Sequence, residues 1–276
     1  MADTCVGCRK TPTRTGFVDY LGDLPFRESA LTKFWNERQK KRLLAVDLKA
    51  QQTGEDVLKK ELENTPPTLR GEESSLESIG EVDIAALLDM LDGTDLLQRD
   101  LGNWCSALVL FSTREPARII TAAIGVPNKE IYYTDANGAY VRLPRTAPNV
   151  PPTKRQVLMV GRTTPLRDAS LAFYGQKCGN FSAIARKTAF MKRFEELAEE
   201  SEEAKKNDKP ETAPQLRIYN LAGNPMMLAL IEDRIDVIFE TQGQKCHEVA
   251  PGFVIALKTG AYLRACNKTS LFVRRS

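Results

Sequence analysis

The sequence contains a single histidine, His247, among its 276 residues. A Ser-His-Asp hydrolase would depend on this one residue, and a zinc site built from several histidines is excluded. Carboxylates, in contrast, are plentiful, with 36 Asp and Glu residues. Because hard cations such as Mg²⁺ and Ca²⁺ prefer oxygen ligands, we expect any metal site here to be rich in carboxylates.

An excess of charge of one sign is also missing, and so are long apolar runs. The 39 Lys and Arg residues nearly balance the 36 acidic ones, which leaves a net charge of +3. Charge alone therefore does not argue for nucleic acid or a membrane surface. Apolar runs such as 107–111 and 253–257 are too short to span a bilayer. The first residues lack the apolar stretch of a secretory signal. We expect a cytoplasmic protein that binds neither a nucleic acid polymer nor a membrane.

Close cysteine pairs are scarce, because only Cys5 and Cys8 of the six cysteines lie near each other in the sequence. A zinc site needs two more ligands, and no second pair exists. We expect Cys5 and Cys8 to lie in an inert N-terminal tail. Binding of a structural zinc ion or a redox function of this pair is the alternative. We expect free thiols in general, and we expect Cys105 to be a core residue of a strand rather than a catalytic thiol.

The spacing of apolar residues predicts helices that alternate with strands. Before residue 65 we expect one helix over about 27–49 and a second over about 55–62, with Thr53 and Asp56 forming a start like a capping box. A long helix with a charged, solvated end is expected over about 181–206. Strand signals lie at 84–88, 104–111, 119–126, 130–133 and 157–160, a hairpin turn at 135–138, and alternating strand and helix signals at 216–219, 225–232, 237–239 and 253–257.

Prolines at positions 144, 148, 151 and 152 mark a boundary between two halves of the chain. We therefore expect an irregular lead-in over residues 1–24, an N-terminal α+β half over 25–147 and a C-terminal α/β half over 148–276. The alternation of strands and helices predicts an α/β fold class.

Two aspartates follow the apolar strand that begins near residue 84. Asp89 and Asp92 stand three residues apart, so a turn can direct both carboxylates to one point beside the Leu91 carbonyl. Gly93 allows the backbone to approach a ligand closely, and Thr94 opens a helix whose free N–H groups suit a phosphate. Such a group of oxygens beside an anion suits Mg²⁺ bound to phosphate. An isolated Asp-Gly-Thr is also an ordinary turn.

Other acidic stretches accompany this motif. Glu72 and Glu73 follow a glycine upstream of the strand, and in an extended chain one of them can face the metals while the other points away. Thr53 and Asp56 add a hydroxyl and a carboxylate at a predicted helix start. Glu248 stands just before an apolar, helical run near the C-terminus.

The order of these motifs resembles the inositol monophosphatase family of the Mg²⁺-dependent, lithium-sensitive phosphatase superfamily. That family has Thr-x-x-Asp near its start, then Gly-Glu-Glu, an apolar strand into Asp-Pro-Ile/Leu-Asp-Gly-Thr, and Trp-Asp-x-Ala-x-Gly near its end. The likeness covers about residues 50–262. It implies a layered αβαβα sugar-phosphatase-like fold of two sub-domains, with the site between the halves, and a homodimer. The matching stretches are 53–56, 71–73, 89–94 and 247–252.

The resemblance also implies roles for single residues. It implies that Mg²⁺, as roughly two or three ions, is held by Glu72, Asp89, the Leu91 carbonyl, Asp92 and Glu248. It implies that Asp56, Thr94 and Glu72 do the catalytic work, orienting and deprotonating the attacking water. It implies that the substrate is bound by Gly93, Thr94, Ala222, Gly223 and Glu240.

The chain departs from the family pattern at several positions. Met90 replaces the proline of the aspartate motif. Asn224 and Pro225 replace the Ser-Ala that follows the glycine at the position of Gly223 in the family. His247 and Glu248 replace Trp-Asp, so Glu248 offers a carboxylate one methylene longer. The bisphosphate nucleotidase branch has Lys-Trp-Asp-Thr-Cys-Ala-Pro here, and in that register His247 takes the place of the aspartate. Both registers stay open.

The resemblance implies an enzyme, a Mg²⁺-dependent phosphomonoesterase that hydrolyses a phosphorylated polyol or sugar with metal-activated water. A bisphosphate nucleotidase or fructose-bisphosphatase-like activity is the nearest alternative. A different class is a descendant of the fold that does not hydrolyse and instead binds a phosphorylated ligand or a partner protein. The expected partner in either enzyme reading is a small-molecule phosphate monoester.

Overall fold

The computed structural model describes residues 30–64, 67–71, 83–98, 104–114, 118–126, 130–143, 153–157, 164–175, 178–240, 244–266 and 269–273, with the side chains of all of these except 30–44, 95, 98, 240 and 262–273. The predicted lead-in over 1–24, with Cys5 and Cys8, lies outside the described residues. The chain divides into two units, residues 1–42 and 43–276. The described part of the first unit is helical, and the rest of the description concerns the second.

The two helices expected before residue 65 are one continuous helix, α2 (Ala30–Glu61). Thr53 is therefore inside a helix rather than at a helix start, and its hydroxyl donates to the Lys49 carbonyl at 2.7 Å. Gly54 costs a helix about 1 kcal/mol relative to alanine, which is too little to end it. A Cβ at Gly54 would lie 2.2 Å from the sulfur of Met90, so the glycine allows close approach of the helix to the strand below.

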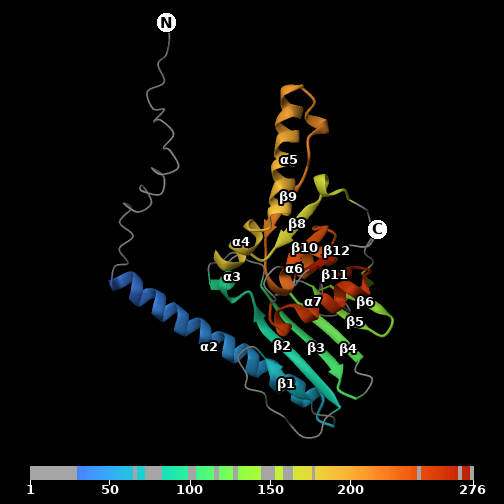
Figure 1. Ribbon diagram of the computed structural model, residues 1–276. Helices are drawn as coiled ribbons and strands as arrows, with labels where there is room; N and C mark the ends of the chain where they lie inside the picture. The colour runs from blue at the N-terminus through green and yellow to red at the C-terminus, as the bar shows by residue number, and fades with distance from the viewer. Residues whose placement is uncertain are drawn as a thin grey trace. The chain divides into compact units, whose positions relative to one another are not determined.

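Among the described residues, seven strands form the first sheet in simple chain order, β1 to β7, and Figure 1 labels β1 to β6 of them. The first pair is parallel and every later pair is antiparallel, so most of the sheet is a meander. The predicted hairpin turn at 135–138 is confirmed between β5 and β6. The strands are β1 (Thr68–Gly71), β2 (Ile84–Asp92), β3 (Cys105–Ser112), β4 (Arg118–Gly125), β5 (Ile131–Asp135), β6 (Gly138–Arg142) and β7 (Lys154–Gln156).

The second sheet, as far as the chain is described, has five strands in the order β11-β12-β10-β8-β9. They are β8 (Ser170–Phe173), β9 (Arg217–Asn220), β10 (Val237–Glu240), β11 (Tyr262–Cys266) and β12 (Thr269–Val273). β8 pairs in parallel with both β9 and β10. The two sheets thus separate between β7 and β8. The proposed division into halves at residue 148 stays a prediction.

The helices of the second half differ from the prediction at one point. The long helix expected over 181–206 is two helices, α4 (Cys178–Ala185) and α5 (Thr188–Lys206), separated at Arg186 and Lys187. The remaining helices are α3 (Thr94–Gln98), α6 (Gly223–Ile231) and α7 (Cys246–Lys258), and two short 3-10 turns lie at Leu166–Asp168 and Pro210–Thr212. No helix in the described ranges combines the length and the apolar character needed to cross a bilayer.

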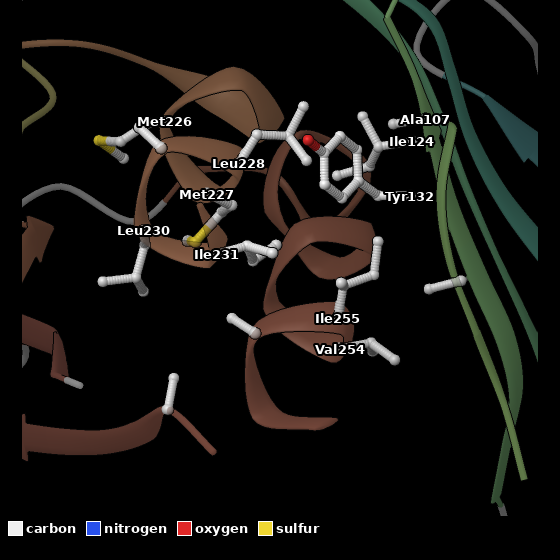
Figure 2. Close-up of a cluster of buried hydrophobic side chains, with 14 of the residues drawn as sticks. Ala107, Ile124, Tyr132, Met226, Met227, Leu228, Leu230, Ile231, Val254 and Ile255 are labelled. Atoms are coloured by element: carbon white, nitrogen blue, oxygen red, sulfur yellow. The ribbon is translucent and has the colours of Figure 1, made fainter. Parts of the chain in front are cut away.

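Three apolar clusters show how these elements are layered. One joins α2 to the outer face of the first sheet, through Leu58 packed against Leu69 and Leu88. The largest lies between the sheets and is filled by α6 and α7; Figure 2 shows Met227, Leu228, Val254 and Ile255 of these helices with Ala107, Ile124 and Tyr132 of the first sheet. The third joins α4 and α5 to the second sheet. The predicted αβαβα layering is confirmed.

Candidate functional site

Two buried carboxylates lie at the end of β2, on the face that looks toward α6 and α7. Asp89 is 2% exposed and Asp92 is 8% exposed. Residues three apart on a regular strand point to opposite faces. Here the register shifts, because Asp89 pairs with Ala107 and Asp92 with Cys105, so three steps on β2 oppose two on β3. This β-bulge turns both carboxylates to the same side of the sheet.

Asp92 contacts the first residues of α6. The backbone N–H of Asn224 donates to Asp92 Oδ2 at 2.5 Å. Gly223 has φ +60°, and a Cβ there would lie 2.3 Å from Asp92 Oδ1. A carboxylate at a helix N-terminus is favoured by the free N–H groups and by the helix dipole. Asp92 therefore fixes the start of α6, and only glycine fits the backbone beside it.

Thr94 begins α3 as predicted, directly after Gly93 with φ +96°. Its hydroxyl lies 2.9 Å from the Leu91 carbonyl oxygen and 3.2 Å from Asp47 Oδ2. Asp47 is on α2 and is 9% exposed. The carboxylate that reaches Thr94 is therefore Asp47, a residue that the motif-based reading of the sequence did not single out.

Asp47 belongs to a buried polar stripe on α2. Asp47, Gln51 and Glu55 follow one another at four-residue spacing, so they share a face of the helix, and all three are buried. The Gln51 amide donates to Glu55 Oε1 at 2.8 Å. The same amide lies over Gly71 at the end of β1, where a Cβ would come within 2.0 Å of it. The spacing of these three residues was the signal available in the sequence.

Asp56 is placed differently. One residue beyond Glu55, it lies about 100° further around the helix and is exposed. Its Oδ1 accepts a hydrogen bond from the Gln52 amide at 2.8 Å. The interpretation of 53–56 as a helix start is wrong, because α2 is continuous through these residues. The catalytic role predicted for Asp56 stays a prediction.

Cys105 lies beside the two aspartates on β3 and is 1% exposed, which confirms it as a core residue. Burial raises the pKa of its thiol well above the usual range, and the negative charges of Asp92 and Asp89 raise it further. Cys105 is the residue of β3 that pairs with Asp92, and the next residue but one, Ala107, pairs with Asp89.

The start of α7 lies next to the start of α6. The Lys245 N–H donates to Glu248 Oε2 at 2.7 Å, so this carboxylate closes the first turn of α7. The side chain of His247 is 7% exposed. The Asn224 side chain connects the two helices, since its amide nitrogen donates to the His247 carbonyl at 3.3 Å and its oxygen accepts from the Gly252 N–H at 2.8 Å.

No family model and no curated protein matches the sequence at a significant level. Solved structures, however, match the fold. The extragenic suppressor protein SuhB of Bartonella henselae matches with a TM-score of 0.58 at 15% identity, covering 85% of this chain and 84% of that one. SuhB of Mycobacterium tuberculosis gives 0.55 at 16%, covering 84% and 79%. CysQ from Bacteroides thetaiotaomicron, a bacterial member of the inositol monophosphatase family, gives 0.51 at 16%, covering 78% and 80%.

The chain has the inositol monophosphatase fold. Among the other structures that match, one is an IMPase/NADP phosphatase complexed with Mg²⁺ and phosphate, and another is a Ca-bound IMPase family protein from Staphylococcus aureus. A structural match to proteins with only 15% and 14% sequence identity establishes the fold of this chain and not its activity. The chemistry therefore rests on the residues of this chain.

On the inositol monophosphatase fold, the predicted substrate-side residues fall at the ends of secondary-structure elements. Ala222 is the residue before α6 and has extended backbone angles, and Gly223 begins that helix. Glu240 is the last residue of β10, where it pairs with Ser270 of β12, and its side chain is outside the description. The structure thus places Gly223 against Asp92, while no contact of Ala222 or Glu240 with the aspartates is described.

The donor set fits a hard divalent cation in its chemistry. Asp89 and Asp92 supply carboxylate oxygens, and the Leu91 carbonyl lies between them in the chain. Among the described residues, no three His, Cys, Asp or Glu side chains gather into a group that could hold a metal. Glu72, the third predicted carboxylate, lies outside the described residues. The residue before it, Gly71, pairs with Leu88, the neighbour of Asp89.

Proposed function

We propose that this protein is a phosphatase of the inositol monophosphatase superfamily that hydrolyses a small phosphate monoester with the help of divalent cations. The observation that carries the proposal is the hydrogen bond from Thr94 Oγ1 to Asp47 Oδ2, beside the buried carboxylates Asp89 and Asp92. A hydroxyl paired with a buried carboxylate next to two acidic side chains is a suitable arrangement for activating water. The fold supports the same function.

Proton transfer is assigned to Thr94 and Asp47. The Thr94 hydroxyl lies 2.9 Å from the Leu91 carbonyl oxygen and 3.2 Å from Asp47 Oδ2, and it has one proton to donate. In this mechanism that proton goes toward Asp47 Oδ2 while the attacking water donates a proton toward Thr94 Oγ1. The water oxygen forms a bond to phosphorus as the bond from phosphorus to the leaving oxygen breaks. The leaving oxygen takes its proton from solvent. Phosphoryl transfer depends mainly on positioning and charge neutralisation, so neither a histidine nor a covalent nucleophile is needed.

We assign the cation site to Asp89, the Leu91 carbonyl and Asp92, with Glu72 as a further ligand that the family resemblance implies. Mg²⁺ held there, as roughly two or three ions, would lower the pKa of water and neutralise phosphate charge. The contribution of α7 is assigned to Glu248, as the resemblance implies. Its carboxylate accepts the Lys245 N–H, as the Asp92 carboxylate accepts the Asn224 N–H, and a carboxylate that accepts one N–H still has acceptor sites for a cation.

The substrate class proposed is a phosphorylated polyol or sugar. Gly93 and Thr94 are assigned to the phosphate, and Ala222, Gly223 and Glu240 to the rest of the substrate, as in the sequence-based prediction. A bisphosphate nucleotide or a fructose bisphosphate is the nearest alternative substrate. A homodimer in the cytoplasm, without nucleic acid or membrane partners, belongs to the same proposal.

The test is phosphate release from a panel of sugar, polyol and nucleotide phosphates, with and without Mg²⁺. We expect release that requires Mg²⁺ and that falls by about 10²- to 10⁴-fold in kcat for Thr94→Ala and Asp47→Asn, because the proton acceptor is removed. Glu61→Gln, at the exposed end of the same helix, is the matched control and should keep the wild-type rate.

Two outcomes would contradict this assignment. If Asp56→Asn abolishes release while Asp47→Asn does not, the sequence-based choice of Asp56 holds and the Thr94–Asp47 pair is structural. If Asp92→Asn retains full Mg²⁺-dependent release, the cation site is misassigned. Circular dichroism of each variant verifies that it is folded before rates are compared.

A second candidate is a protein of this fold that binds a phosphorylated ligand or a partner protein without hydrolysis. The observation in its favour is at α7, where the Glu248 carboxylate is engaged by the Lys245 N–H and His247 is buried. Calorimetric binding of inorganic phosphate in the presence of Mg²⁺, with no release from any substrate in the panel, would favour this candidate.

A further inference from the structure

A proline interrupts the hydrogen bonding of α7. Pro251 lies inside the helix, at its sixth residue. Proline has no N–H, so it cannot donate to the carbonyl four residues back, and its ring crowds that carbonyl. The carbonyl concerned belongs to His247, which is in the first turn of α7. This part of the helix is buried, so an acceptor left without a donor here would be costly.

The side chain of Asn224 lies at this interruption. Asn224 is on α6 and is 0% exposed. Its amide nitrogen donates to the His247 carbonyl at 3.3 Å, which supplies the donor that Pro251 lacks. Its oxygen accepts the N–H of Gly252, the residue after the proline, at 2.8 Å. One carboxamide thus offers a donor and an acceptor to α7, as a peptide group would.

The chemistry of the two α7 partners fixes the orientation of this amide. The His247 carbonyl can only accept and the Gly252 N–H can only donate. A reversed Asn224 amide would place oxygen against oxygen and N–H against N–H. Gly252 also has to be small, because a Cβ there would lie 2.3 Å from Cβ of Met227 and 3.2 Å from Asn224 Oδ1. The two helices therefore meet closely at this point.

The same residue contacts the proposed cation site through its backbone. The N–H of Asn224 donates to Asp92 Oδ2 at 2.5 Å. A single residue is therefore bonded to Asp92 by its main chain and to both sides of the break in α7 by its side chain. A shift of α7 relative to α6 would move the donor that holds the Asp92 carboxylate.

We propose that Asn224 is a positioning residue, which supplies the N–H donor that Pro251 lacks and thereby holds the Asp92 carboxylate in place for a divalent cation. The proposal rests on the proposed function for its catalytic consequence. Its structural and metal-binding consequences do not depend on any substrate. It predicts that stability and cation binding depend on the Asn224 side chain because residue 251 is a proline.

The experiment is a double-mutant cycle of Asn224→Ala and Pro251→Ala on the full chain. The readouts are the midpoint of urea unfolding, the dissociation constant of Mn²⁺ measured by electron paramagnetic resonance, and phosphate release. Loss of a residue that orients a metal ligand typically weakens metal binding by about 10- to 100-fold, and we expect this for Asn224→Ala. Restoring the N–H with Pro251→Ala should recover most of the loss in both Mn²⁺ binding and unfolding.

Asn180→Ala removes another buried amide, on α4 in the layer across the second sheet, and should leave the Mn²⁺ dissociation constant unchanged. Asn224→Asp keeps an acceptor for Gly252 but has no donor for His247, so it serves if the alanine variant does not fold. It should also weaken Mn²⁺ binding and be relieved by Pro251→Ala.

Two results overturn the proposal. In one, folded Asn224 variants bind Mn²⁺ as the wild type does. In the other, the effects of Asn224→Ala and Pro251→Ala on the unfolding midpoint and on the free energy of Mn²⁺ binding are additive in the double variant. Absence of phosphate release from every variant, with Mn²⁺ binding coupled as expected, would instead contradict the proposed function and leave this inference supported.

Discussion

At the scale of single residues, the extra residue that forms the β-bulge in β2 determines where the two acidic side chains of the proposed site point. The bulge between Asp89 and Asp92 places both side chains on the face toward α6 and α7, where a regular strand would separate them. Gly223 then allows α6 to begin directly against Asp92. The proposed site is thus built from backbone geometry as much as from the acidic side chains themselves.

Gly223→Ala should damage both stability and cation binding. At φ +60° a side chain costs about 1–3 kcal/mol, and its Cβ would also collide with the Asp92 carboxylate, 2.3 Å away. We expect a lower unfolding free energy and weaker Mn²⁺ binding. Gly179→Ala, in α4 with nothing within 4 Å of the added Cβ, is the control and should be neutral or stabilising by up to ~1 kcal/mol. Equal effects of the two substitutions would contradict this reading of Gly223.

At the scale of elements, α2 and the β5–β6 hairpin show how polar groups fix local structure. The buried stripe of Asp47, Gln51 and Glu55 gives α2 a polar face toward the end of β1 and the start of α3. In the hairpin, Asp135 Oδ1 accepts the N–H groups of Asn137 at 2.8 Å and Gly138 at 3.1 Å. Side-chain to backbone bonds of this kind are the reason that Asp initiates turns.

The hairpin should lose stability in acid because of Asp135. Partial desolvation raises the pKa of this carboxyl, but the two backbone N–H groups and Lys154 outweigh it and hold the pKa below its ordinary value. A carboxyl with a lowered folded-state pKa stabilises the fold above its unfolded-state pKa, and this contribution is lost as pH falls through the folded-state value. Urea unfolding from pH 7 to pH 3 should therefore show a smaller loss for Asp135→Asn than for the wild type. An identical pH dependence in the two proteins would refute the role of this carboxyl.

At the scale of the whole second unit, α6 and α7 hold the two sheets together. The largest apolar cluster takes residues from both sheets and both helices, including Ile238 of the second sheet. Figure 2 shows Ile124 of the first sheet with Leu230 and Ile255 of the two helices. The proposed site is next to these two helices, because Asn224 of α6 donates hydrogen bonds to Asp92 and to the His247 carbonyl of α7. Packing and the proposed chemistry therefore depend on the same two helices.

This arrangement predicts that residues 43–276 unfold as one cooperative unit. Leu230→Ala and Ile255→Ala, both at fully buried positions, should each cost about 2–5 kcal/mol. Ile119→Ala, at a position that is 52% exposed, should cost much less. The measurement is urea unfolding followed by far-UV and near-UV circular dichroism. Non-coincident transitions would show that the two sheets unfold separately.

Local patterns in the sequence were enough to predict much of this protein. Alternation of strands and helices predicted the α/β fold class, and Asp135 to Gly138 predicted a hairpin, because both depend on neighbours in the chain. The order of the acidic motifs predicted the inositol monophosphatase fold, which the solved structures bear out. The exposure of Asp56 and the continuity of α2 were not predictable in this way, since one glycine does not end a helix.

The sequence by itself determined which acidic residues follow which strand and where the chain turns, because such features are set by residues a few positions apart. Only the tertiary structure decided that Asp47 pairs with Thr94, that a bulge brings Asp89 and Asp92 to one face, and that Asn224 meets the break at Pro251. The contacts of Asp47 and Asn224 join residues far apart in the chain, and the bulge depends on the pairing of β2 with β3. All three therefore depend on the sheet and on the helices α2, α6 and α7 that pack against it.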